Sequence, residues 1–525
     1  MNILGLGGLL NEAAAAVLVD GRIVSAVEQK KIAPRRHRVG LPTEAIHATL
    51  ELAGVAADSI ETVSLARPFV DRTDGRHLTQ ELRSLFPNAR IAGVEHHRAH
   101  AASSYFASPF DEATILTLDN SGDFRCGALW KASGTSIQLE KEFTFPDSLG
   151  DLYTRVTELL GFKPSSEEHK VQWLSTSGND SLESVFHSIL VQPSVGLRAD
   201  RSWFDHNRIG RGGFSARFYS ALGLEDGAPV PAGLFPNIAA GLQRAIERIV
   251  IELAGEGENL CLAGGLGLNA LLVDALEQCG KWKNVYVQPV SGNAGTALGA
   301  AWHAWHQLQG ETRRVPLDTL ALGPAFGQEE IKRVLENCKL HFKYLLTTDE
   351  VVSSAVEHLS GDRIVAWMQG RMEFGSRALG NRSILASPLN PYSTENLNVF
   401  IKHREPFRKF AASVPAERAS EYFDAGPNAR FLASVGRVKP EHSKTFESAV
   451  LGDGLVRVHT VDKKENPLFH RLLEAWGQKT GVPVLYNTSF NLFGDPMVCT
   501  PRDAVRSFYS SGIDSMVIGN FVLDK

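Results

Sequence analysis

The stretch NLCLAGGLGLNALLVDALEQ (residues 259–278) contains both kinds of secondary structure that decide the fold. Its first residues, 259–263, predict a buried strand, and residues 268–278 carry a helical pattern after the glycines. The alternation recurs in strand-like runs at 114–118 and 284–288 and in helical patterns at 237–253 and 294–309. Strands that alternate with helices predict an α/β fold.

The chain is long enough for more than one domain. At 525 residues it exceeds the size at which a single hydrophobic core keeps growing. Residues 311–327, with Pro316 and Pro324, break the preceding helical pattern and predict a linker. We therefore expect one domain at 1–310 and a second at 328–525.

Both predicted domains mix strands and helices. The first begins with a strand at 2–7 and a hairpin of 15–19 and 23–28, joined by Asp20-Gly21 and followed by a helix from Thr43. The second has strand patterns at 363–368, 482–486 and 515–518 and helical patterns from 328, near 394–403 and at 501–510.

Composition narrows the classes of partner. The net charge of −5 and the pI near 6.4 give no general attraction to nucleic acid or to anionic lipid. No stretch approaches the length of a membrane span, and the start of the chain lacks a basic leader. The five scattered cysteines form no CxxC pair, which favours reduced thiols and a cytoplasmic location. We expect no nucleic-acid and no membrane partner.

A histidine cluster at residues 95–100, EHHRAH, predicts a metal site. On a helix, His96 and His100 lie one turn apart on one face, where both imidazoles can bind one cation. Asp119 closes the strand pattern at 114–118 and offers a carboxylate. Two histidines and one carboxylate suit Fe(II), with zinc as the competitor. The alternative is a solvated histidine cluster at the start of a helix.

The glycines of the opening stretch match a relaxed dinucleotide-binding pattern, Gly265-x-Gly267-x-x-Ala270. The following strand pattern lacks the acidic residue that would bind a ribose, so close packing of helix on strand explains the glycines equally well. An NAD-dependent oxidoreductase is the function that this pattern alone would indicate.

Cationic residues gather in the C-terminal half. Residues 370–383 contain Arg371, Arg377 and Arg382 among glycines, and residues 401–408 contain Lys402, Arg404 and Arg408. Guanidinium groups and accessible backbone N–H groups favour phosphate, so the two segments predict an anion site. The alternative is a solvated basic helix face. Polar residues at 486–491, after the strand pattern at 482–485, suit the orientation of a phosphate or nucleotide.

Together these segments resemble the NodU/CmcH/TobZ carbamoyltransferase family. The resemblance covers nearly the whole chain and rests on several ordered motifs: HHRAH (96–100), LTLDNSGD (116–123), LAGGLGLN (262–269), GNAGTALGAA (292–301), RMEFGSRALGNRSIL (371–385), IKHREPFRKFAASV (401–414) and VPVLYNTSFN (482–491). It implies an N-terminal domain of the ASKHA (actin-like ATPase) type and a C-terminal YrdC-like α/β domain.

The resemblance also implies a two-stage reaction. Carbamoyl phosphate and ATP, with Mg, would form carbamoyl adenylate at the C-terminal site. The residues implied there for catalysis are Arg377, Lys402 and Arg408, and those for binding also include Arg371, Arg382, Arg404, Ser489 and Asn491. The carbamoyl group would then pass to a hydroxyl or amine of a small-molecule acceptor at the N-terminal site. That site would hold Fe(II) or another divalent ion on His96, His100 and Asp119, with a nucleotide near Gly264, Gly265, Asn269 and Lys170.

Departures from the family pattern lie in the N-terminal half. Asn11 and Glu12 stand where the family has a His-Asp pair with a catalytic or binding role, so the resemblance implies that these two residues belong to the catalytic site. Asn293 stands where the family has a metal-binding Asp. Asn293 keeps an oxygen but no charge, so we expect it to be a weak metal ligand. A divergent member that serves as a binding or activating subunit of a biosynthetic complex is therefore the alternative function.

Two matters remain open in the sequence. A tRNA-modifying threonylcarbamoyl-type enzyme is a further alternative, which the absence of a basic face disfavours. The acceptor, O- versus N-carbamoylation and the choice between monomer and homodimer are not determined by these patterns.

Overall fold

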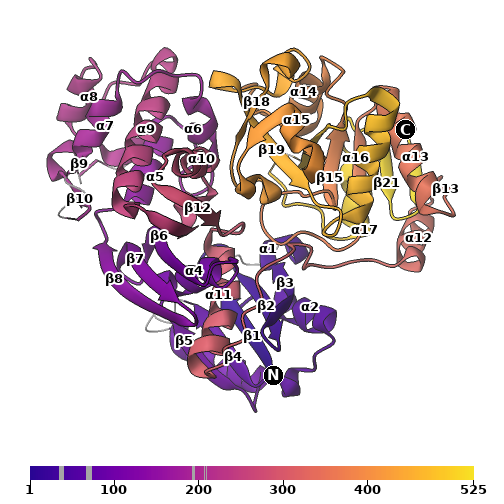
Figure 1. The fold of residues 1–525 in the computed structure, drawn as a ribbon, viewed down its shortest axis with the longest axis horizontal. Coiled ribbons are helices and arrows are strands. Elements are labelled where there is room, and N and C mark those ends of the chain that lie inside the picture. Colours follow the sequence, from indigo (N-terminus) through magenta and orange to yellow (C-terminus); the bar gives the residue numbers. More distant parts are fainter. Residues whose placement is uncertain (35–40, 67–73, 192–195, 206, 209, 493) are drawn as a thin grey trace. The chain divides into compact units, whose positions relative to one another are not determined.

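A computed structural model describes residues 1–34, 41–66, 74–191, 196–205, 207–208, 210–492 and 494–525. The chain forms two compact units (Figure 1). Unit 1 comprises residues 1–94, 293–450 and 454–525, and unit 2 comprises residues 95–292 and 451–453. The predicted division at 311–327 stays a prediction. Those residues, all described, contain no helix or strand.

Unit 1 contains a five-stranded sheet with the order β3-β2-β1-β4-β5. Its strands are β1 (Asn2–Gly7), β2 (Ala14–Val19), β3 (Arg22–Glu28), β4 (Thr62–Ala66) and β5 (Arg90–Val94). The first three strands are antiparallel, whereas β1, β4 and β5 are parallel. Helices α2 (Thr43–Ala53) and α11 (Thr296–His303) pack on this sheet. Gly5 and Gly7 permit the close approach of α11, because a Cβ atom at either glycine would overlap its backbone.

Unit 2 contains a second five-stranded sheet with the order β12-β11-β6-β7-β8. Its strands are β6 (Glu112–Gly122), β7 (Arg125–Ser133), β8 (Ser136–Thr144), β11 (Gly257–Ala263) and β12 (Trp282–Val287). The antiparallel β6-β7-β8 ribbon continues into parallel β11 and β12, so the sheet repeats the topology of the first. The main helices of this unit are α4 (His96–Tyr105), α5 (Leu149–Leu159), α6 (Glu168–Ser175), α7 (Glu183–Ile189), α9 (Phe235–Ala254) and α10 (Ala270–Gln278). This repeated α/β topology confirms the predicted actin-like class.

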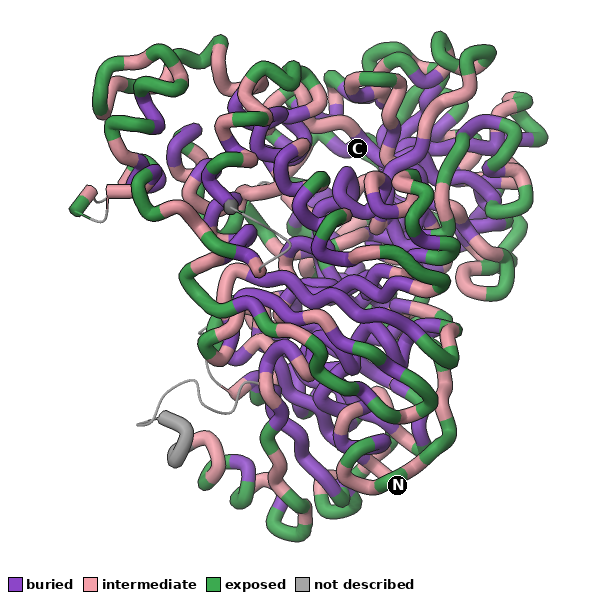
Figure 2. The backbone as a smooth tube through the Cα atoms, turned by 60° about the vertical axis from the view of Figure 1, so that its left-hand side comes forward, coloured by how far each residue is buried: buried purple, intermediate pink, exposed green. Residues whose placement is uncertain are grey.

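The C-terminal part of unit 1 is built on a ten-stranded mixed sheet with the order β13-β22-β21-β14-β15-β20-β16-β19-β18-β17. In chain order the strands are β13 (Lys343–Tyr344), β14 (Val365–Met368), β15 (Arg382–Ala386), β16 (Ala411–Pro415), β17 (Phe423–Ala425), β18 (Gly436–Val438), β19 (Leu455–Val461), β20 (Leu485–Ser489), β21 (Ser515–Ile518) and β22 (Phe521–Asp524). Its main helices are α12 (Gln328–Asn337), α13 (Thr348–Ser360), α16 (Pro467–Thr480) and α17 (Pro501–Tyr509). The central strands are buried, as the purple segments of Figure 2 show.

Two sequence expectations need correction. The strand predicted at 482–486 is β20, Leu485–Ser489, so Asn487 and Ser489 lie within the strand and not beyond it. Pairing with β15 and β16 extends the strand through these polar residues. The helix predicted near 394–403 is a short α14 (Ser393–Asn396) followed by a π-helical turn, Leu397–Lys402.

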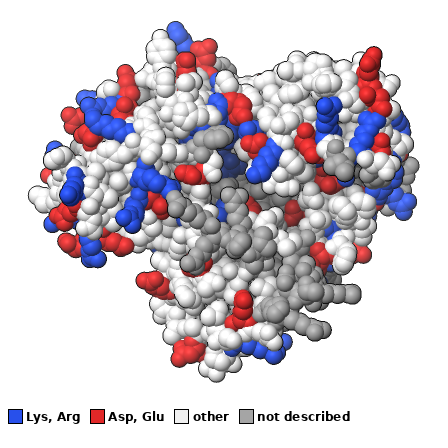
Figure 3. Space-filling view, turned by 180° about the vertical axis from the view of Figure 1, so that it is seen from behind, with Lys and Arg blue, Asp and Glu red and all other residues white. Residues whose placement is uncertain are grey.

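The surface is mixed in charge. Figure 3 shows acidic and basic side chains interspersed over one face, which agrees with the small net charge. No helix of the described residues is both long and apolar enough to span a membrane.

A buried ion pair joins the first sheet of unit 1 to the loop between β14 and β15. Glu28 ends β3, Lys31 follows on α1 (Gln29–Ile32), and each side chain is only 2% exposed. The Lys31 ammonium also donates to the carbonyl oxygens of Glu373 (3.1 Å) and Gly375, and Glu28 accepts the N–H of Gly375 at 3.0 Å. Burial alone would raise the pKa of Glu28, but the charges of Lys31 and Lys30 lower it to about 2. The pair thus fixes the backbone two residues before Arg377.

Lys31→Met is expected to lower the free energy of unfolding by ~3–5 kcal/mol, because it leaves the Glu28 carboxylate buried without its main partner. Lys283→Met, which removes an exposed pair with Glu258, is the matched control and should cost less than ~1 kcal/mol. Urea denaturation measures both. The stabilisation from Glu28 is fully present above its unfolded pKa of 4.5 and is lost as pH falls toward about 2, so the difference between wild type and Lys31→Met should shrink over that range. Equal losses in the two variants would contradict this role of the pair.

Candidate functional site

Two histidines and one aspartate converge in unit 2. Glu95 caps α4 by accepting the N–H groups of His97 and Arg98, and this starts the helix so that His96 and His100 share one face. His96 Nε2 lies 2.9 Å from Asp119 Oδ2, and His100 Nε2 lies 3.3 Å from the same oxygen. The two Nε2 atoms are 3.2 Å apart. The helix and strand β6 therefore bring together the three residues that the sequence predicts.

The trio fits a divalent cation. All three residues are buried, and their ligand atoms lie within 4.8 Å of one another. Burial alone would raise the pKa of Asp119, but hydrogen bonds from His100 and His96 hold it well below its usual range. The carboxylate is therefore ionised, and its other oxygen accepts the Asn120 N–H at 2.8 Å. This donor set matches the pattern of two histidines and one carboxylate that binds Fe(II), while zinc also accepts these ligands.

His97 belongs to a different environment. Its Nδ1 lies 3.1 Å from the Thr117 hydroxyl, which also accepts the indole N–H of Trp130. Burial, followed by the charges of His96 and His100, lowers the pKa of His97 well below its usual value. His97 is thus a buried neutral neighbour of the trio.

Three of the predicted nucleotide residues, Gly264, Gly265 and Asn269, lie just before α10, whereas Lys170 lies on α6. Gly264 has a φ of 94°, and a Cβ atom there would overlap the backbone of Leu118, so only glycine fits this turn. Asn269 caps α10 through Leu272 N and exchanges two hydrogen bonds with Gln243, at 2.8 and 3.1 Å. Gln243 in turn accepts from the Tyr153 hydroxyl at 3.0 Å. The Asn269 amide therefore has a fixed orientation. The Lys170 ammonium lies 2.8 Å from a carboxylate oxygen of Glu167.

The residues that depart from the family pattern contact one another in unit 1. Asn293 donates to Asn11 Oδ1 at 2.9 Å, and Glu12 pairs with Lys30 at 3.1 Å. A metal role for Asn293 and catalytic roles for Asn11 and Glu12 stay predictions, since the His–Asp trio belongs to unit 2.

Four arginines form a cationic cluster in the C-terminal part of unit 1. Burial and then the charge of Arg408 lower the pKa of Arg377 to about 10 and that of Arg404 to about 9. Burial and then the charges of Arg377, Arg404 and Arg408 lower the pKa of Arg457 well below its usual range. The Arg404 guanidinium also lies 4.4 Å above the Phe410 ring. Arg408 also lies 3.9 Å from Glu405, and the remaining like charges of the cluster favour an anionic ligand.

Sequence reasoning missed Arg457. It lies on β19, in LVRVHTV, where strand alternation places Arg457 and His459 on one face and Val456 and Val458 on the other. Arg457 and Asn487 both pair with Ala411, so they share one face of the sheet. Asn487 is 2% exposed, and its Oδ1 meets no partner within the described part of the chain. The signal that reveals Arg457 is a lone arginine that alternates with buried valines in the strand LVRVHTV.

Three of the predicted cations donate mainly to the protein's own oxygen atoms, although Arg382 Nε has no hydrogen-bond partner among the described residues. Lys402 Nζ donates to the Ser489 carbonyl (2.5 Å), the Asn491 carbonyl (2.9 Å) and Asn491 Oδ1 (2.7 Å), which brings these predicted residues together. Arg382 is fully buried and donates to backbone carbonyls that include Gln369 and Pro324, and Arg371 donates to Leu322 and Val24. These three side chains hold the backbone, which leaves the arginine cluster as the candidate anion site.

Comparison with known proteins identifies the family. Residues 77–302 match the family described as Carbamoyltransferase N-terminus, and residues 356–525 match Carbamoyltransferase C-terminus. An uncharacterized protein of Synechocystis is 34% identical, over 100% of this chain and 97% of its own. The nodulation protein NolNO of Sinorhizobium fredii is 32% identical, over 98% of this chain and 79% of its own. A 3'-hydroxymethylcephem-O-carbamoyltransferase of Amycolatopsis lactamdurans is 34% identical over 50% of this chain and 48% of its own.

Among solved structures, HypF of T. kodakarensis covers 60% of this chain and 48% of its own at 16% identity, with a TM-score of 0.35. The activator of 2-hydroxyisocaproyl-CoA dehydratase from Clostridium difficile covers 60% of this chain and 99% of its own, also with a TM-score of 0.35. Both structural similarities are weak. The family assignment therefore rests on the sequence matches, which show that the chain belongs to the carbamoyltransferase family that includes the NodU and CmcH proteins.

The trio is expected to bind one divalent cation, and His100→Ala should weaken that binding by more than ~100-fold, beyond the effect of changing a group that only supports a ligand. His97→Gln is the matched control, because His97 is equally buried but bonds to Thr117. Titration with Fe(II) and Zn(II), read by equilibrium dialysis, measures both. Equal loss in the two variants, with both folded, would show that the trio does not bind the ion.

Proposed function

We propose that the protein forms carbamoyl adenylate at the arginine cluster and transfers the carbamoyl group to a hydroxyl or amine of a small-molecule acceptor. In the first stage, water releases phosphate from carbamoyl phosphate, and an oxygen of the resulting carbamate attacks the α-phosphorus of ATP. Pyrophosphate leaves. In the second stage, the acceptor attacks the carbamoyl carbon and AMP leaves.

The observation that carries the first stage is the buried cationic cluster in which the charges of Arg377, Arg404 and Arg408 act on Arg457. Both reactants are anions, so bringing them together requires cations that offset their repulsion and hold them in line. Guanidinium groups keep their charge even with lowered pKa values of about 9 and 10. Family membership supports the choice of carbamoyl phosphate as donor.

The His–Asp trio supports the second stage. A divalent ion held by His96, His100 and Asp119 would polarise a carbonyl oxygen or lower the pKa of an acceptor hydroxyl. The chain's own contribution is to keep Asp119 ionised and both imidazoles aimed at one point. Asn269, fixed by Gln243, offers its amide to a nucleotide beside the glycine turn.

A second function is favoured by the amide pair of Asn11 and Asn293. These two residues hydrogen-bond to each other where the family has a His-Asp pair and a metal-binding Asp. Under this alternative the chain activates carbamoyl phosphate but serves as a binding or activating subunit for transfer. Formation of adenylate without transfer to any acceptor by the purified chain would favour it.

Purified protein with ATP, Mg and carbamoyl phosphate should release pyrophosphate without an acceptor. Arg377→Ala, Arg408→Ala and Arg457→Ala should each lower that rate by at least ~100-fold, the effect of losing one charged contact in the transition state. Arg418→Ala, which removes contacts with Glu421 and Tyr422 away from the cluster, is the matched control and should leave the rate unchanged. Release that persists in the three cluster variants would refute the assignment of the site.

A further inference from the structure

We propose that Glu373 binds the amino group of the carbamoyl donor, and that a small acid-lined pocket beside the arginine cluster thereby selects carbamoyl phosphate over acyl phosphates that lack N–H groups. This inference rests on the proposed function and identifies the residue that determines donor specificity.

One carboxylate oxygen of Glu373 is fully engaged and the other is not. Oε1 accepts three backbone N–H groups, from Leu379 (2.7 Å), Asn381 (2.8 Å) and Arg382 (3.2 Å). Oε2 has no hydrogen-bond partner among the described residues, although the side chain is only 1% exposed. A buried carboxylate oxygen without a donor is costly, so this atom requires a donor from outside the protein.

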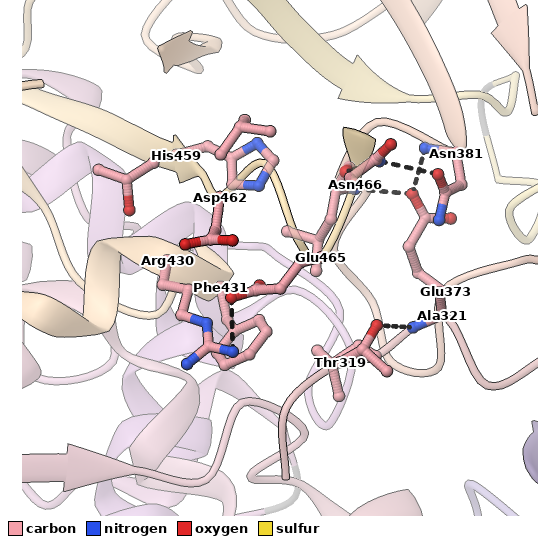
Figure 4. A pocket seen from close by; sticks show the side chains of 14 residues that line it. Thr319, Ala321, Glu373, Asn381, Arg430, Phe431, His459, Asp462, Glu465 and Asn466 are labelled. Carbon is pink, nitrogen blue, oxygen red and sulfur yellow. Dashed lines mark hydrogen bonds and ion pairs between the residues drawn. The ribbon is translucent and has the colours of Figure 1, made fainter. Parts of the chain in front are cut away.

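Glu373 lines a pocket that combines polar side chains with apolar ones such as Leu320, Leu379 and Phe431. Figure 4 shows Glu373 and Asn381 on one side and Arg430 and Asp462 on the other. The cavity volume of about 30 Å³ suits one or two water-sized groups, such as an amino group. Glu465, also at this pocket, is paired with Arg430 at 2.5 Å, so Glu373 is the better acceptor for a ligand.

The pocket and the arginine cluster share two segments of the chain, one around Arg377 and Leu379 and the other on β19. His459 lines the pocket and lies two residues after Arg457 on β19, which separates their Cα atoms by roughly 7 Å on one face of the sheet. Leu379 lines the pocket and lies two residues after Arg377. A ligand with a phosphate on the arginines can therefore extend its other end toward Glu373.

The arginine cluster and Glu373 match the two ends of carbamoyl phosphate. The phosphate has only acceptor oxygens at neutral pH, so the guanidinium groups bind it and Glu373 repels it. The carbamoyl NH₂ has two donors, which a carboxylate oxygen accepts. His459 is neutral, since burial lowers its pKa to about 3, and its Nδ1 lies 2.9 Å from the Ser413 hydroxyl. It therefore does not offset the charge of Glu373.

The test compares carbamoyl phosphate with acetyl phosphate, in which a methyl group replaces the amino group. We expect wild type to show a kcat/KM for pyrophosphate release at least ~1,000-fold higher with carbamoyl phosphate, because a site built to bind an N–H rejects the analogue without it. Glu373→Gln keeps an oxygen for the three backbone N–H groups but replaces the free oxygen with an NH₂ donor. It should reduce the selectivity at least ~100-fold and leave the KM for ATP within about twofold.

The outcomes are separable. No pyrophosphate release by wild type with carbamoyl phosphate would refute the proposed function itself. An active wild type that uses acetyl phosphate within ~10-fold of carbamoyl phosphate would overturn the proposal without any variant. Unchanged selectivity in folded Glu373→Gln would show that the pocket holds only water, and a raised KM for ATP with unchanged selectivity would assign the pocket to the adenine amine. Either result also overturns it.

Discussion

The buried Glu28–Lys31 ion pair is the constraint on which the anion site depends. A loop rich in glycine and arginine does not adopt one conformation by itself, because glycine increases the conformational entropy of the backbone and the arginine side chains repel one another. Lys31 binds two carbonyl oxygens of such a loop, and Glu28 binds one of its N–H groups. Glu373 then fixes the next turn through three backbone N–H groups. A residue near the start of the chain thus positions Arg377, far away in sequence.

The two candidate sites differ in how their charges are balanced. In unit 2, Asp119 supplies a negative charge to two imidazoles, whose Nε2 atoms lie 2.9 and 3.3 Å from its Oδ2. In unit 1, Arg377, Arg404, Arg408 and Arg457 raise one another's electrostatic energy, which an anion would relieve. The first arrangement favours a metal ion and the second favours phosphate, which is the division of chemistry that two half-reactions require.

The sequence predicts local geometry well, but it does not predict which cationic side chains donate their hydrogen bonds to the protein itself. The spacing of His96 and His100 and the strand before Asp119 were sufficient to place the trio, because helix and strand periods fix which side chains meet. Lys402 and Arg382 look alike in sequence to Arg377 and Arg408, yet the structure gives their donors to carbonyl groups. Such pairings join segments that are distant along the chain. A single arginine in the strand LVRVHTV belongs to no motif that would predict an anion site. The strand pattern at 482–486 ends too early because the polar end of β20 pairs with β15 and β16.

We infer that activation and transfer use separate sites. This inference is tested by comparing carbamoyl-phosphate-dependent pyrophosphate release with carbamoyl transfer in Asp119→Ala protein, using an acceptor that wild type accepts. We expect pyrophosphate release to stay within about twofold of wild type while transfer is lost, because Asp119 belongs to the metal trio alone. Equal loss of both activities in a protein that melts like wild type would contradict it and would indicate one composite site.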